Sequence, residues 1–128
     1  MSYIYDLFKD RKAANLLVEK TFREGEAIFE EGDESNSIYI IEKGNVIIEK
    51  AINKEKTGFK DIAIISEGNF LGEIAMFENT RRTARARALT DITAVEITRE
   101  NFFEITKTDP ELSVKIFSFI IETLAERI

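Results

Sequence analysis

Two features that suit a bound anion lie ten residues apart in this chain, at Gly72 and Arg82. Gly72 opens a short apolar run, 73–77, which is predicted to form one turn of helix. The free N–H groups at the start of such a turn attract phosphate. Arg82 heads a segment in which alanine occupies positions 84, 86 and 88. Because side chains alternate across a strand, Arg82 is expected on this small apolar face, toward the core.

A guanidinium on a buried face stays ionised and is costly without an anion beside it. Two anions are available to Arg82. One is Glu73, which would give an internal salt bridge in a protein that binds no ligand. The other is a ligand phosphate, in which case Glu73 accepts hydrogen bonds from a hydroxyl group and from Arg82. A ligand with one phosphate beside a sugar hydroxyl suits the second arrangement.

The segment also follows a longer pattern: an aromatic residue, Gly-Glu, a short apolar helix, a loop, and Arg before a small residue and Ala. The positions that match are Phe70, Gly72, Glu73, Ile74, Ala75, Arg82, Thr83 and Ala84. This pattern resembles the phosphate-binding cassette of the cyclic-nucleotide-binding domain family, which includes catabolite-activator-type regulators and cyclic-nucleotide-dependent kinases. Residues 22–29, 31–33, 38–41 and 44–46 resemble the first turns and a hairpin of that family, so the resemblance covers roughly residues 17–128.

The resemblance implies a role for each matching position. Glu73 would bind the ribose 2′-hydroxyl, and Arg82 with nearby amides would hold the cyclic phosphate. The ligand would be cAMP or cGMP, with cAMP favoured, and Thr83 does not decide between the two. Arg81 stands where the family often has proline, but counting from Gly72 and from the Thr-Ala pair both favour Arg82 as the phosphate residue.

Composition excludes several other kinds of site. The chain has no cysteine and no histidine, so iron–sulfur clusters, disulfides and the usual haem and metal ligands are not expected. Hydrolytic triads lack a base, and metal-dependent cupin enzymes with a similar β-roll lack their ligands. We therefore expect no enzyme activity, no metal and no cofactor. A net charge of −6 argues against nucleic-acid binding, and Arg81, Arg85 and Arg87 are expected on a solvated strand face.

We expect one domain over residues 1–128, because its 128 residues are enough to bury a core. Neither a membrane-length apolar run nor a signal peptide is evident, so no membrane contact and a cytoplasmic location are expected. Short β-forming runs broken by glycine between 17 and 97 predict an antiparallel β-roll or jelly roll. A short helical start at 1–16 and helices at 98–128 flank it, which makes the fold class mainly β with flanking helices.

The C-terminal helices carry clear start signals. Thr98 is predicted to cap a first helix, and Asp109 followed by Pro110 is predicted to begin a second one that runs to Ile128. The apolar residues of that second helix cover more than one packing face. Either the helix is deeply buried, or a second copy of the chain covers the additional face, with Phe117 and Ile121 near the centre of a 110–128 homodimer interface.

Two functional hypotheses follow. The favoured one is a regulatory sensor that binds a cyclic nucleotide in its β-roll and transmits occupancy through its C-terminal helices. The alternative is a ligand-free dimerisation or structural module that keeps the roll and an internal Arg82–Glu73 pair.

Overall fold

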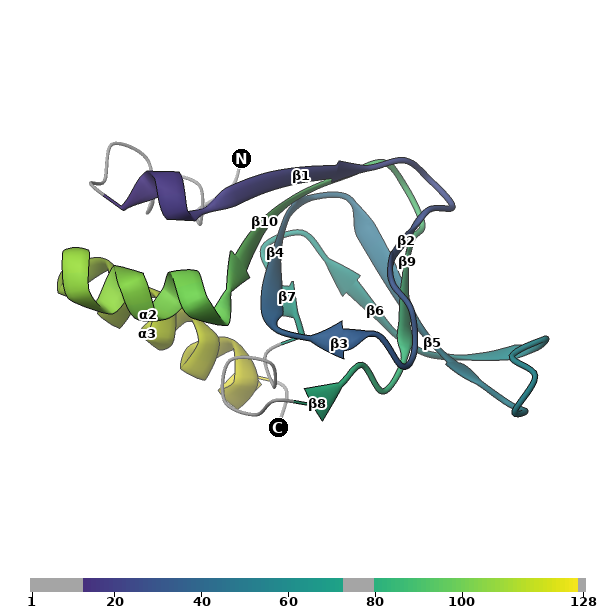
Figure 1. Cartoon of the computed structure of the whole chain (residues 1–128). Helices are drawn as coiled ribbons and strands as arrows, with labels where there is room; N and C mark the ends of the chain where they lie inside the picture. The colour runs from purple at the N-terminus through teal and green to yellow at the C-terminus, as the bar shows by residue number, and fades with distance from the viewer. Residues whose placement is uncertain (1–12, 73–79, 127–128) are drawn as a thin grey trace.

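The computed structural model of the chain describes residues 13–72 and 80–126 (Figure 1). In chain order its elements are η1 (Ala14–Leu16), β1 (Val18–Phe22), β2 (Ala27–Phe29), β3 (Glu34–Ser35), β4 (Ser37–Lys43), β5 (Asn45–Ala51), β6 (Phe59–Ser66), β7 (Phe70–Leu71), β8 (Thr80–Arg81), β9 (Arg85–Ala88), β10 (Ile92–Thr98), α2 (Arg99–Thr108) and α3 (Pro110–Glu126). The predicted fold class, mainly β with flanking helices, is confirmed. Most of the predicted helical start at 1–16 lies outside the described residues. Neither described helix is long and apolar enough to cross a membrane.

The strands form two four-stranded sheets and one short pair. Their orders are β1-β10-β4-β7, β2-β9-β5-β6 and β3-β8, and all described pairings are antiparallel. Figure 1 shows the sheets curving around one interior, with α2 and α3 against one end and the β5–β6 hairpin projecting from the other. The tip of that hairpin contains the polar residues 53–57.

Strand β4 separates two apolar cores, because its alternate residues point to opposite sides. Ile38 and Ile40 pack with the helices, while Tyr39 and Ile41 pack inside the roll. The same alternation places Ala86 and Ala88 of β9 inside the roll, fully buried. The predicted small apolar face is therefore confirmed for β9. That strand begins at Arg85, so Arg82 lies in the break between β8 and β9 rather than within an extended strand.

Both predicted helix starts are confirmed. The Thr98 hydroxyl accepts a hydrogen bond from the Asn101 N–H at 3.0 Å, which satisfies one of the free amides of the first turn of α2. The Asp109 carboxylate does the same for Leu112 at 3.2 Å, immediately before Pro110 begins α3. These caps fix where the two helices begin. The buried residues of both helices then cover one face of the first sheet, namely Phe102, Ile105, Leu112, Ile116 and Ile120.

Helix α3 leaves part of its apolar surface open, as the sequence suggested, but Phe117 does not belong to that part. Val114 and Ile121 are 62% and 63% exposed. Phe117 instead packs against the helical core, with its ring edge-on to Phe102 at a centroid distance of 4.8 Å. The expectation that Phe117 lies on the open face is therefore wrong, because its side chain meets Phe102 of α2.

Candidate functional site

Arg82 is held by its backbone against the turn that joins β2 to β3. Its N–H donates to the Asp33 carbonyl at 2.8 Å, and its own carbonyl accepts from the Gly32 N–H at 2.8 Å. These two bonds continue the β3–β8 pairing by one residue after β8 ends. They direct the side chain of Arg82 toward the inside of the roll, and Arg82 is only 7% exposed. The predicted burial of this arginine is present in the structure.

The guanidinium of Arg82 has a defined orientation. Its Nη2 donates to the Ser37 carbonyl at 2.8 Å and lies 3.4 Å from the Ser37 hydroxyl. Its Cζ lies 4.2 Å from the ring centroid of Phe29 and 5.8 Å from that of Tyr39. A carbonyl, a hydroxyl and two aromatic rings orient the group through hydrogen bonds and cation–π attraction.

Gly72 lies directly beside this guanidinium. Its φ of +85° belongs to the left-handed region that L side chains rarely adopt, and a Cβ at this position would overlap Nη1 of Arg82. Glycine is therefore required twice, once for the backbone turn after β7 and once for the close approach of Arg82. The structure thus brings together Gly72 and Arg82, the two residues that the sequence singled out as suited to a bound anion.

The other predicted site residues have different surroundings. Phe70 is fully buried and packs edge-on against Phe119 of α3, with ring centroids 5.6 Å apart. Thr83 is exposed, and Ala84 is half-buried beside it. Glu73, Ile74 and Ala75 lie outside the described residues. Of the predicted set, Gly72 and Arg82 are therefore the two that the described structure places against each other.

Ser37, which holds Arg82, is itself held by polar residues of neighbouring strands. The Ser37 hydroxyl donates to Glu96 Oε2 on β10 at 2.8 Å, and Lys20 Nζ lies 3.7 Å from Glu96 Oε1. Burial, followed by the charge of Glu96, raises the pKa of the Tyr39 phenol to about 12. Tyr39 therefore stays neutral near Arg82 at every physiological pH. Glu96 therefore fixes the position of Ser37, and Ser37 in turn holds the guanidinium of Arg82.

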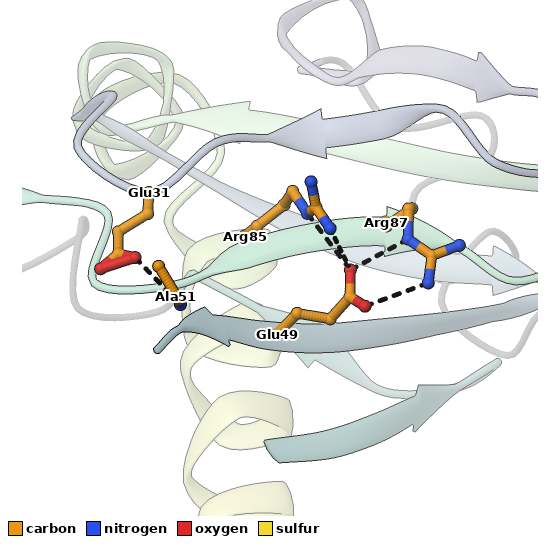
Figure 2. A network of polar contacts seen from close by, with 5 residues as sticks. All are labelled: Glu31, Glu49, Ala51, Arg85 and Arg87. Atoms are coloured by element: carbon orange, nitrogen blue, oxygen red, sulfur yellow. Dashed lines mark hydrogen bonds and ion pairs between the residues drawn. The ribbon is translucent and has the colours of Figure 1, made fainter. Parts of the chain in front are cut away.

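Arg85 and Arg87 correct another expectation. Instead of lying on a fully solvated face, both bind Glu49 of β5, as Figure 2 shows. Arg85 donates to Oε1 through Nε and Nη2, and Arg87 donates to both carboxylate oxygens at 2.9 and 3.0 Å. Hydrogen bonds from Arg87, reinforced by Arg85, lower the pKa of Glu49 against the opposing effect of its burial. The side chains do point away from the roll interior, as alternation requires, but they form an ion-pair cluster there.

Several residues that shape the site were not predicted. Phe29, Ser37 and Tyr39 reach Arg82 from β2 and β4, which are distant in sequence. The one signal available was the alternation of β4, which indicates that neighbouring residues of this strand face opposite ways. Nothing in that alternation specifies which of them meets Arg82.

The described structure is therefore a roll of antiparallel strands that holds a buried arginine, Arg82, beside a glycine turn at Gly72. Residues 19–109 match the family model of the cyclic nucleotide-binding domain. The chain belongs to this family, and the resemblance seen in the sequence is confirmed.

Known relatives extend this assignment. The chain is 35% identical over 89 residues to a cAMP-dependent protein kinase regulatory subunit of Candida albicans, over 70% of this chain and 18% of that protein. It is 30% identical over 97 residues to the lysophospholipase NTE1 of Chaetomium globosum, over 75% of this chain and 6% of that protein. A crystal structure of a cyclic nucleotide-binding domain from Methylobacillus flagellatus superposes with a TM-score of 0.79 at 19% identity, over 97% of this chain and 75% of that one. The matched segment therefore makes up less than a fifth of either curated relative named here.

Proposed function

We propose that this domain binds cAMP and acts as a regulatory sensor. The observation that carries the proposal is the arginine of the cassette, Arg82, which is oriented by Ser37 and Phe29 and contacts Gly72. A phosphate that reaches this guanidinium gains charge-assisted hydrogen bonds, which are stronger than neutral ones. The name of the Candida albicans kinase subunit favours cAMP over cGMP as the ligand.

In this proposal different cassette residues bind different parts of the ligand. Arg82, with amides that follow Gly72, binds the cyclic phosphate, and Glu73 binds the ribose 2′-hydroxyl. Ile74, Ala75, Thr83 and Ala84 complete the walls around the sugar-phosphate, and Phe70 supports the turn from beneath. The roles of Glu73, Ile74 and Ala75 come from the family pattern alone, since these residues lie outside the described part of the chain.

Phe70 offers a route from the site to the C-terminal helices. It lies two residues before Gly72 and packs directly on Phe119 of α3. Suppose that the ligand binds one conformation of the Gly72 turn more tightly than another. It would then favour the packing of Phe70 on α3 that accompanies that conformation. Such differential binding is what any ligand-driven conformational change requires. We propose that occupancy reaches α3 in this way.

The open face of α3 supports a homodimer through the 110–128 helix. Val114 and Ile121 are its large exposed apolar residues, and Ala125 is exposed beside them. A second copy of the helix would cover these side chains. We also propose that the unit is a single domain without enzyme activity of its own. Its proposed location is the cytoplasm, because a messenger made inside the cell is sensed there.

Ligand-dependent thermal stability tests the proposal against the ligand-free alternative. A ligand present at 100 times its dissociation constant adds about 2.7 kcal/mol to the free energy of unfolding, which raises the melting temperature by several degrees. We expect this rise with cAMP, a smaller one with cGMP, and none with 5′-AMP. An unchanged melting temperature with millimolar amounts of both cyclic nucleotides would support a module with an internal Arg82–Glu73 pair instead.

A further inference from the structure

Phe29 makes the closest aromatic contact with Arg82. It is the last residue of β2, its side chain is half-buried against the core inside the roll, and its ring centroid lies 4.2 Å from Arg82 Cζ. Tyr39 lies behind it, with a centroid distance of 6.1 Å between the two rings. Phe22 continues the cluster on the far side of Tyr39, at 6.4 Å. Three rings therefore form one cluster, and Phe29 is the member nearest the arginine.

The position of this ring restricts how Arg82 can meet an anion. A cation placed over an aromatic face is attracted by the negative face of the ring, and the attraction grows as water is excluded. At 7% exposure, Arg82 is largely out of water. The Phe29 ring also occupies one side of the guanidinium, so an anion must approach Arg82 from elsewhere. Ser37 holds Nη2 and limits rotation of the group. The pair therefore fixes one orientation before any ligand arrives.

We infer that Phe29 is a positioning residue for phosphate binding, acting through Arg82. This inference rests on the proposed function, since it assigns Phe29 to the same site. A guanidinium that is already oriented loses less freedom when its ligand binds, and preorganisation of this kind appears as higher affinity. Removing the aromatic face while keeping the apolar volume should therefore weaken ligand binding and leave the fold in place.

The test compares substitutions that separate packing from the aromatic face. Phe29→Leu keeps an apolar side chain and removes the ring, and Phe29→Met is a second variant of this kind in case the branched side chain packs poorly. Phe29→Tyr keeps the ring. Phe22→Leu is the matched control, because Phe22 belongs to the same cluster and contacts Tyr39 rather than Arg82.

Affinity for cAMP is measured by titration calorimetry on variants whose melting temperatures show that they are folded. We expect about a tenfold loss for Phe29→Leu and Phe29→Met, which corresponds to about 1.4 kcal/mol. Phe29→Tyr and Phe22→Leu should stay within about threefold of the wild type, a difference well below 1 kcal/mol. Equal affinity of Phe29→Leu and the wild type, or an equal loss in Phe29→Tyr, would overturn the inference.

A spectroscopic measurement on the ligand-free protein tests the contact between Phe29 and Arg82 independently. Protons of the Arg82 side chain that lie over an aromatic ring resonate upfield, and this shift should disappear in Phe29→Leu and persist in Phe22→Leu. Absence of the shift in the wild type would overturn the inference without affecting the proposed function. Conversely, a wild-type protein that shows the shift but binds neither cAMP nor cGMP would overturn the proposed function, and with it the role of Phe29 in ligand binding.

Discussion

Replacing Glu49 with glutamine removes the centre of the Arg85–Glu49–Arg87 cluster (Figure 2) and should destabilise the domain markedly. Glu49 is 5% exposed, and its carboxylate accepts four hydrogen bonds from the two guanidinium groups. Glutamine has nearly the same shape but no charge. The substitution therefore leaves two neighbouring cations on β9 without the carboxylate that joins them.

The magnitude follows from the burial of each partner. Removing one member of a fully buried ion pair costs about 3–5 kcal/mol, whereas exposed pairs contribute about 1 kcal/mol or less. The side chains of Arg85 and Arg87 are 21% and 33% exposed, so solvent screens part of the interaction. We therefore expect Glu49→Gln to lower the free energy of unfolding by roughly 2–3 kcal/mol, and the melting temperature by roughly 8–12 °C in a domain of this size.

Urea unfolding at pH 7 measures this difference, and Asp61→Asn is the matched control. Asp61 lies opposite Glu49 in the β5–β6 register but is exposed, so its substitution should change the free energy of unfolding by less than about 0.5 kcal/mol. A Glu49→Gln variant within about 0.5 kcal/mol of the wild type would refute the reasoning, because surface substitutions typically have effects of that size.

The difference in the free energy of unfolding between the wild type and Glu49→Gln should also depend on pH, in a defined direction. The pKa of Glu49 is lowered in the folded protein, so its carboxylate stabilises the fold fully above the unfolded pKa of about 4.3. That stabilisation is lost as the pH falls from there through the folded value. The gap between wild type and Glu49→Gln should therefore be constant between pH 6 and 8 and shrink below about pH 4.3. A gap that widens on acidification would contradict the assignment.

Three further predictions concern the turn, a helix cap and assembly. Gly72→Ala should weaken cAMP binding more than tenfold because its Cβ displaces Arg82, whereas Gly68→Ala, which has a similar φ of +84° but open space around it, should leave affinity unchanged in calorimetry. Thr98→Ala should lower the free energy of unfolding by about 1 kcal/mol, and Thr98→Ser by less, in urea titrations; equal losses would contradict a capping role. Val114→Glu with Ile121→Glu should convert a dimer into a monomer that still binds ligand, and a wild type that sediments as a monomer at high micromolar concentration would contradict the interface.

Features set by local rules were the ones that the sequence predicted well. Ala86 and Ala88 share a face because alternation is a property of any strand, and Thr98 and Asp109 mark helix starts through contacts three residues away. Gly72 and Arg82 stood out for the same reason, since one supplies a turn and the other a charge among small apolar residues. Each of these residues can be recognised from its own type and from its immediate neighbours in the chain.

Features that depend on packing between distant strands were missed. Glu49 lies 36 and 38 residues before the two arginines that it binds, and only the pairing of β5 with β9 brings them together. Phe29 likewise meets Arg82 because the backbone of Arg82 bonds to the turn that follows β2. Phe117 was misplaced because helical periodicity shows that α3 has two apolar arcs but not which arc meets α2. Register and docking angle, which no single segment encodes, decide all three cases.

The affinity of Arg82→Ala for cAMP, compared with that of Arg81→Ala, tests the central claim most directly. Arg81 is adjacent in sequence, but it is exposed and donates to the Gly32 carbonyl at 2.9 Å. Truncating one partner of a buried charge pair costs about 2–5 kcal/mol, so Arg82→Ala should bind cAMP at least 30-fold more weakly than the wild type. Arg81→Ala should remain within about threefold, a difference well below 1 kcal/mol. Wild-type affinity in Arg82→Ala, or a greater loss in Arg81→Ala, would contradict the account.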